Sequence, residues 1–287
     1  MIILFAYIIM NKNIERIAVQ FYLSHPKMRK FMLVFRDTLF PIKPRFSGLA
    51  IKAFNDPPWI DETKNSVFNK TSNDLKNFQF GSVLSTGIDV HKVDSLLWRH
   101  WIVSYATKHA LKFAKSDNFI FVECGVGDGM SAFYTLREIS TDSKICEKSK
   151  IHLFDSWGPM KKEDLLESEL GSEDRYSELE LKATQNNLKE YDDLIIYHKG
   201  YIPKIFDENP ESPDSIIYMH IDLNSTKPTI DSLKYFFPKL VSGGVILFDD
   251  YGWNNHKDTK HAVDDFFKDR SGSLLHLPTG QAIFYKY

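Results

Sequence analysis

The sequence predicts an α/β protein whose main domain is a doubly wound, mostly parallel sheet that ends in an antiparallel hairpin. Three observations predict this class. Short apolar runs recur from residue 119 to the C-terminus, helix-compatible segments separate most of them, and a glycine-rich loop follows the first run. Almost continuous apolar runs are typical of strands that helices cover on both faces. The alternation of strand and helix favours a parallel sheet.

Each element of this sheet can be placed along the chain. A long amphipathic helix is expected over 96–115, because apolar residues recur there at roughly helical spacing. The expected strands are 119–125, 151–155, 194–200, 215–222, 243–250, 274–278 and 281–287. The expected connecting helices are 131–139, 178–191, 228–240 and 260–269. Only Thr279 and Gly280 separate the last two strands, so these must form an antiparallel hairpin.

Composition excludes several classes of protein. The chain has 287 residues, of which 43% are hydrophobic, and this is enough to bury a core without disulfides or metals. A formal net charge of −2 gives no reason to expect nucleic-acid binding. Two cysteines, Cys124 and Cys146, cannot build a disulfide framework, so we expect a cytoplasmic protein.

Residues 1–85 are expected to form an N-terminal arm of helices and loops, and residues 86–287 the main domain. The arm begins with ten apolar residues, which are too few to cross a bilayer. We expect them to form a core helix or strand. The alternative is contact with an anionic membrane surface, since positions 12–52 contain nine basic residues and only two acidic ones, Glu15 and Asp37. In that case the protein is peripheral to the membrane.

The strongest local motif is the loop VECGVGDGM at 122–130, where the first strand turns into a helix. Gly125, Gly127 and Gly129 allow a sharp turn and close approach of a ligand to the backbone, next to unpaired N–H groups of a helix N-terminus. Such loops occur in NAD and FAD enzymes and in methyltransferases. Here the acid Glu123 comes just before the glycines. That position suits the amino-acid end of a cofactor better than a pyrophosphate, which a carboxylate would repel.

Further acids end other predicted strands. Asp155 ends the second strand and is placed to accept hydrogen bonds from ribose hydroxyls, with Ser156 beside it. Asp222 ends the fourth strand, and Asp249 and Asp250 end the fifth. Open α/β sheets bind ligands at the carboxyl ends of their strands, so these three carboxylates should share one cleft. Three close carboxylates repel one another unless a cation neutralises them, and Mg²⁺ fits oxygen ligands of this kind.

Two histidines follow the paired acids and are candidate general bases, because histidine titrates near neutrality. They are His256 and His261, and His256 is the one that we assign as a catalytic residue. A surface or packing role is the alternative for each. The ten histidines show no zinc-like spacing, and the chain contains neither a G-x-S-x-G elbow nor a P-loop.

These residues together resemble the macrocin O-methyltransferase (TylF-type) family of class I S-adenosylmethionine-dependent enzymes. The resemblance covers residues 92–287 and is carried by the entry helix, the glycine motif, LFDSWGPM at 153–160, the segment from His220 to Gly252, and the ending LPTGQAIFYK. It implies a Rossmann-like, seven-stranded sheet. It also implies that Glu123 and the three loop glycines surround the methionine part of the cofactor, while Asp155 holds its ribose.

The resemblance further implies a magnesium ion held by Asp222, Asp249 and Asp250. Asn224 stands where relatives often have a second Asp, and its amide oxygen can still coordinate a metal. The implied reaction is magnesium-assisted methylation of a hydroxyl on a sugar or related polyol, in which Asp222 relays the proton and His256 is the second candidate base. Related enzymes also suggest self-association.

Two other functions stay open at this point. One is an NAD(P)-dependent oxidoreductase that uses the same glycine loop, although the terminal hairpin and Glu123 argue against it. The other is a non-catalytic binding protein that keeps the fold. The acidic stretch at 163–180 could be a lid over the cleft or a solvated helical face.

Overall fold

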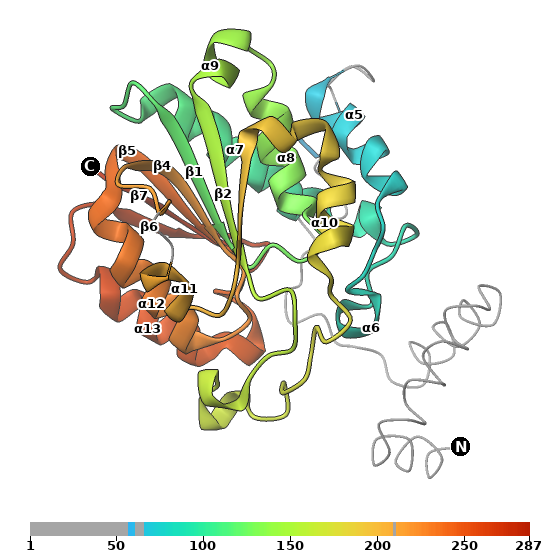
Figure 1. Ribbon diagram of the computed structural model, residues 1–287. Coiled ribbons are helices and arrows are strands. Elements are labelled where there is room, and N and C mark those ends of the chain that lie inside the picture. The colour runs from blue at the N-terminus through green and yellow to red at the C-terminus, as the bar shows by residue number, and fades with distance from the viewer. Residues whose placement is uncertain (1–56, 61–65, 209–210) are drawn as a thin grey trace. The chain divides into compact units, whose positions relative to one another are not determined.

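A computed structural model describes residues 57–60, 66–208 and 211–287 (Figure 1). The chain divides into two units, 1–58 and Trp59–Tyr287, and nearly all described residues belong to the second. The predictions made for residues 1–56, including membrane contact, lie outside the described residues. Among the helices that are described, none is both long enough and apolar enough to span a bilayer.

The main unit is built on a seven-stranded sheet with the order β3-β2-β1-β4-β5-β7-β6. The strands are β1 Phe119–Cys124, β2 Ser149–Asp155, β3 Ile195–Lys199, β4 Ile216–Ile221, β5 Leu240–Phe248, β6 Ser273–His276 and β7 Ala282–Tyr285. The first five strands pair in parallel, and β7 pairs antiparallel with both β5 and β6. The predicted fold class, a Rossmann-like parallel sheet with a C-terminal antiparallel hairpin, is therefore confirmed. Strand β5 begins earlier than expected because Leu240 still pairs with Ile216 of β4.

Helices cover both faces of this sheet (Figure 1). The longer ones are α5 Val67–Asp74, α7 Leu97–Phe113, α8 Met130–Ile139, α10 Leu181–Asn187, α12 Thr226–Phe236 and α13 Lys257–Phe267. The shorter ones are α6 Val83–Thr86, α9 Ser143–Glu147 and α11 Lys204–Asp207. Helices α5, α7, α8 and α10 lie on one side of the strands, and α11, α12 and α13 lie on the other. The expected helix at 178–191 is shorter, because a 3-10 segment follows it at Lys189–Leu194.

Alternate strand residues supply the two hydrophobic cores. Phe121, Ile151 and Leu247 pack with α7 and α8, whereas their neighbours Val122 and Phe248 pack with α12 and α13. Successive side chains of a strand point to opposite faces, so a continuous apolar run supplies both layers at once. This burial explains why the strands could be recognised from composition alone.

The segment before α7 packs with the main unit. Phe68 of α5 is 1% exposed, and its ring contacts Trp101 of α7 and Tyr134 of α8 at centroid distances of 5.0 and 5.3 Å. Within the described part, residues 66–86 therefore belong to the same compact body as the sheet. The division of the whole chain into an arm at 1–85 and a domain from 86 stays a prediction.

A pair of stacked histidines joins the edge strand β3 to its neighbour β2. His152 Nδ1 and His198 Nε2 are 2.9 Å apart, and both side chains are 5% exposed. Burial lowers the pKa of each imidazole to about 4, with the neighbouring ring adding to the effect at His152. The folded protein therefore keeps both rings neutral at pH values where the unfolded chain would protonate them.

This pair predicts acid sensitivity. Above pH 6.5, the pKa of histidine in the unfolded chain, the two buried imidazoles do not reduce the free energy of unfolding. As the pH falls from 6.5 toward 4, the unfolded state binds more protons than the folded state, so the free energy of unfolding falls. We expect the free energy of unfolding to fall by about 2–3 kcal/mol for each imidazole over this range. His152→Gln keeps a hydrogen-bonding group that does not titrate. In urea unfolding measured from pH 7.5 to 4, the free energy of unfolding of this variant should therefore depend less on pH than that of the wild type. Parallel profiles for variant and wild type would contradict the assignment.

Candidate active site

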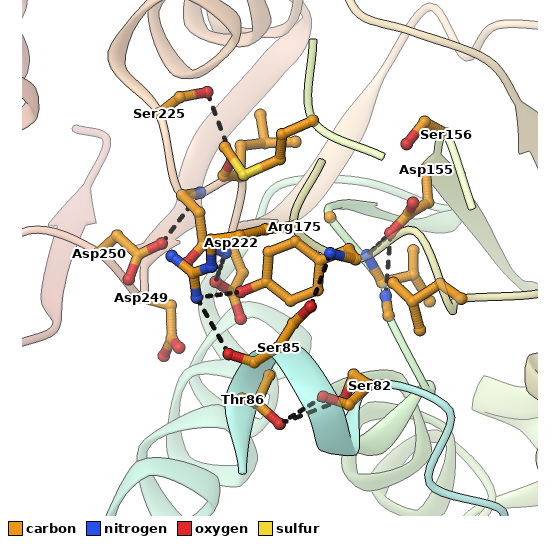
Figure 2. A pocket seen from close by; sticks show the side chains of 18 of the residues that line it. Ser82, Ser85, Thr86, Asp155, Ser156, Arg175, Asp222, Ser225, Asp249 and Asp250 are labelled. Atoms are coloured by element: carbon orange, nitrogen blue, oxygen red, sulfur yellow. Dashed lines mark hydrogen bonds between the residues drawn. The ribbon is translucent and has the colours of Figure 1, made fainter. Parts of the chain in front are cut away.

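One cavity opens at the carboxyl ends of the parallel strands, where the chain order reverses between β1 and β4. This is the position at which open α/β sheets bind ligands. The cavity has a volume of about 390 Å³. Figure 2 shows Asp155 and Ser156 on one side of it, and Asp222, Asp249 and Asp250 on the other. These five predicted residues, with Glu123, Gly125 and Gly127, all line the cavity.

The glycine loop fits the strand ends closely. Gly125 has a φ of 85°, and a Cβ atom there would collide with the backbone carbonyl of Asp222. Gly127 has a φ of 54°, but a Cβ atom would meet no protein atom within 4 Å. Gly125 is thus required by contact with β4, whereas Gly127 is required by its backbone conformation and leaves space on its ligand side. Gly129 does not line the cavity and instead caps the N-terminus of α8.

The second acid of the loop, Asp128, anchors a segment that the sequence did not connect with the site. Its carboxylate accepts hydrogen bonds from the backbone N–H groups of Gly81 and Ser82, at 2.7 and 3.1 Å, and from Ser82 Oγ at 2.6 Å. Ser82, Ser85 and Thr86 consequently line the cavity. In the sequence, only the Gly-Ser pair before α6 indicates a turn at this segment. It gives no indication that the segment binds Asp128.

Asp155 holds the glycine loop in place. One carboxylate oxygen accepts from the N–H groups of Val126 and Gly127 at 2.7 and 2.9 Å, and the other accepts from Trp157 N–H at 2.7 Å. Burial raises the pKa of Asp155, and these backbone donors offset part of that effect. A carboxylate offers about four acceptor positions, so about one remains for a ligand hydroxyl. Its predicted role at a ribose stays a prediction.

Glu123 presents a carboxylate oxygen that lacks a partner. The side chain is 1% exposed, and its Oε2 makes no hydrogen bond to any residue in the described part of the chain. His220 Nδ1 lies 3.6 Å away, just beyond hydrogen-bond distance but within ion-pair distance. Burial raises the pKa of Glu123, and His220 offsets part of that rise. A buried acceptor without a donor is costly, so this atom points to a missing ligand donor.

Asp222 and Asp250 form a carboxylate pair at the other side. Burial and the Asp250 carboxylate raise the pKa of Asp222 to about 6. Burial also raises the pKa of Asp250, and the guanidinium groups of Arg99 and Arg175 lower it in part. Asn224 contacts both acids, through its N–H to Asp250 Oδ2 at 3.0 Å and its amide nitrogen to Asp222 Oδ1 at 3.4 Å.

Asp249, the third predicted metal ligand, is engaged differently from the other two. Arg99 of α7 forms an ion pair with it, and Gln281 Nε2 donates to Oδ1 at 2.7 Å. Both of its oxygens are therefore occupied by protein donors. Across the ranges that the structure describes, no group of three or more His, Cys, Asp or Glu side chains is arranged to hold a metal ion. The sequence placed the acids at one edge correctly but gave no sign that Arg99 would reach Asp249.

His256 lies near the acid pair but outside the cavity lining. Its Nε2 is 3.7 Å from Asp250 Oδ1, and burial lowers the pKa of the imidazole. His261 is exposed on α13 and does not line the cavity. His256 can therefore reach a cavity ligand only past Asp250, and its predicted role as a base stays a prediction.

Residues 158–180, here called the covering loop, lie against the cavity and contain short 3-10 segments in place of a solvated helix. Arg175 and Tyr176 from this loop line the cavity together with Met160 and Lys161. The sequence offered a lid as one of two interpretations of this acidic stretch. It did not single out any residue within it.

The loop glycines predict different stability losses. Gly125→Ala should lower the free energy of unfolding by at least about 2 kcal/mol, because both the backbone conformation and the contact with Asp222 oppose a side chain. Gly127→Ala should cost about 1 kcal/mol, since only the conformation opposes it. Urea unfolding curves of the two variants test this difference. Equal losses would show that the close approach to β4 is absent.

Residues 122–251 match the protein family described as "Methyltransferase domain". A comparison with curated proteins gives no match. Among solved structures, the O-methyltransferase NovP is similar with 16% identity and a TM-score of 0.54, covering 66% of this chain and 80% of NovP. CalS11, a calicheamicin methyltransferase, is similar with 13% identity and a TM-score of 0.53, covering 80% of this chain and 94% of CalS11. At these identities the structures show a shared fold, and the match at 122–251 supports a methyltransferase domain. The narrower resemblance to macrocin O-methyltransferases is not confirmed.

Proposed function

We propose that this protein is an S-adenosylmethionine-dependent O-methyltransferase that methylates a hydroxyl group of a sugar or related polyol. The observation that carries the proposal is Glu123, whose buried Oε2 lacks a donor at the floor of the cavity. The family match and the shared fold support the cofactor class. The sugar-like acceptor follows from the resemblance carried by the sequence motifs.

The residues present suit this cofactor. Glu123 would accept from the ammonium group of its methionine end, which supplies the donor that the protein lacks there. Gly127 leaves open space on its ligand side, so a ligand can approach the loop backbone closely. Asp155, with Ser156 beside it, would take the ribose hydroxyls on the opposite side of the cavity from Asp222 (Figure 2). When bound, S-adenosylmethionine supplies a methyl group on a positively charged sulfur, and transfer leaves S-adenosylhomocysteine.

The remaining task is to hold the acceptor and remove its proton. We assign Asp222 as the proton acceptor, because its carboxylate lines the cavity at the end of β4 beside the glycine loop. As the hydroxyl oxygen forms its bond to the methyl carbon, the proton passes to this carboxylate. His256 lies beyond Asp250 and is placed to receive a proton next. Fixing the hydroxyl close to the methyl group supplies much of the rate, because alignment removes an entropic cost.

A divalent cation fits part of the site. Asp222 and Asp250 are half-buried, lie close together and offer hard oxygen ligands, so they would hold Mg²⁺, with the Asn224 side chain adjacent. Asp249 does not fit, because Arg99 and Gln281 already bind its oxygens. A bound cation would lower the pKa of a coordinated hydroxyl and fix two neighbouring oxygens of a diol.

Cofactor binding tests the proposed function. S-adenosylhomocysteine should bind the purified protein in isothermal titration, and Asp155→Asn should weaken binding by about tenfold to a hundredfold, since hydrogen bonds to a charged acceptor are lost. Asp164→Asn is the matched control, because Asp164 also lines the cavity but lies in the covering loop. Failure of the folded wild-type protein to bind, or tight binding of NADH instead, would overturn the proposal in favour of a non-catalytic protein or an oxidoreductase.

Metal binding tests the assignment of the acids. In calorimetry with the S-adenosylhomocysteine complex, Asp222→Asn and Asp250→Asn should each weaken Mg²⁺ binding by tenfold or more, because each removes a ligand. Asp249→Asn should change it by less than threefold, since that carboxylate faces Arg99. An equal effect at Asp249 would restore the three-acid site that the sequence predicted.

A further inference from the structure

The covering loop places a cation where the cavity otherwise gathers acids. Glu123, Asp155, Asp222 and Asp250 all line the cavity, and the guanidinium of Arg99 is already paired with Asp249. Arg175, from the covering loop, lies close to Asp222 and Asp250 (Figure 2). It is half-buried and lines the cavity.

Within the protein, the Arg175 guanidinium lies over the Tyr176 ring, 5.1 Å from its centroid, and makes only long hydrogen bonds. Its Nη2 donates to the carbonyl oxygen of Ser85 at 3.4 Å and to Tyr176 Oη at 3.3 Å, both near the upper limit for a hydrogen bond. No carboxylate in the described ranges forms an ion pair with it. A guanidinium has five N–H donors, and the atoms Nε and Nη1 have no hydrogen-bond partner in that part of the chain. Most of the N–H donors of the Arg175 guanidinium are therefore not used to hold the loop.

The backbone nevertheless fixes Arg175 firmly. Its neighbours Asp174 and Tyr176 have φ values of 62° and 65°, a conformation that non-glycine residues rarely adopt. The Arg175 carbonyl accepts from Met160 N–H at 2.9 Å, and Tyr176 N–H donates to Ser85 Oγ at 2.7 Å. Such strained residues persist only where the surroundings hold them, and they gather at functional sites.

A second cation lies on the segment of the loop that pairs with the Arg175 segment. Met160 pairs with Asp174 and Arg175 through backbone bonds, and Lys161 follows it at the cavity. Lys161 Nζ lies 3.7 Å from the centroid of the Tyr201 ring, and Glu163 is at the limit of ion-pair distance, 4.0 Å. The covering loop thus contributes Lys161 and Arg175, with one acid, Asp164, to the lining of an otherwise acidic cavity.

We propose that Arg175 binds an oxyanion, a carboxylate or a phosphate, carried by the methyl acceptor, and that it is a specificity-determining residue for the reaction. This rests on the proposed function. The planar fork of a guanidinium matches both anions through two parallel hydrogen bonds. The acceptor is then an acidic sugar or sugar phosphate rather than a neutral polyol. Arg175 of the covering loop would bind the anionic group of the acceptor while the hydroxyl of the acceptor lies at Asp222.

The experiment begins with S-adenosylhomocysteine titrations of the full-length wild type, Arg175→Gln and Lys162→Gln. Lys162 is the matched control, because it is an exposed cation of the same loop that does not line the cavity. All three proteins should bind with affinities within threefold of one another. Absence of binding to the folded wild type would refute the proposed function before any anion is added. A loss of tenfold or more in Arg175→Gln would assign the residue to the carboxylate of the cofactor and overturn the proposal.

Saturation-transfer NMR with the loaded proteins then uses D-glucuronate, D-glucose 1-phosphate and D-glucose as probes. At least one anionic probe should bind wild type tenfold or more tightly than glucose, and which one does so identifies carboxylate or phosphate. Arg175→Gln should lose that preference, Arg175→Lys should keep part of it because the charge remains without the fork, and Lys162→Gln should keep all of it. Equal or absent binding of anionic and neutral probes to wild type, or an equal loss in Lys162→Gln, would overturn the proposal.

Discussion

The convergence of five parallel strands on one edge is the constraint on which the rest of this structure depends. The acid positions at these strand ends bring carboxylates into a poorly solvated region, where each must gain a hydrogen-bond donor, a cation or a proton. Asp155 obtains three backbone donors from the loop and its own turn. Asp249 obtains Arg99 and Gln281. Glu123, Asp222 and Asp250 are left less completely satisfied, and for that reason they identify where ligands belong.

This constraint also explains why the glycine loop and α7 are fixed so tightly. Gly125 must approach the carbonyl of Asp222, because the loop crosses directly over the end of β4. Arg99 links α7 to the end of β5, and its own carbonyl oxygen accepts from Gln281 of the terminal hairpin at 3.4 Å. The helix that precedes the sheet and the hairpin that ends it are thus joined at one carboxylate. Polar contacts at the site consequently also stabilise the fold.

The sequence was sufficient for the sheet and for the acids at its edge, because both leave local signals. Continuous apolar runs mark the strands, and the residue that ends each run marks the edge. Contacts between distant segments leave no such signal. Neither the docking of Ser82 on Asp128 nor the ion pair of Arg99 with Asp249 follows from spacing, since the partners are 46 and 150 residues apart. The prediction of three metal ligands counted acids without knowing which already had a partner, and it stays a prediction.

Arg175 shows most clearly what a local interpretation misses. The stretch at 163–180 contains eight acids and a single basic residue, so by composition it is an acidic, solvated segment. In the structure this stretch contributes one acid, Asp164, and its single arginine to the cavity lining, and backbone pairing of Arg175 with Met160 holds the arginine there. The surrounding acids, in turn, disfavour anions at the outer surface of the loop. An anion that reaches Arg175 must therefore belong to a molecule that the rest of the cavity also binds. Under this condition Arg175 would select the methyl acceptor and would not bind free anions.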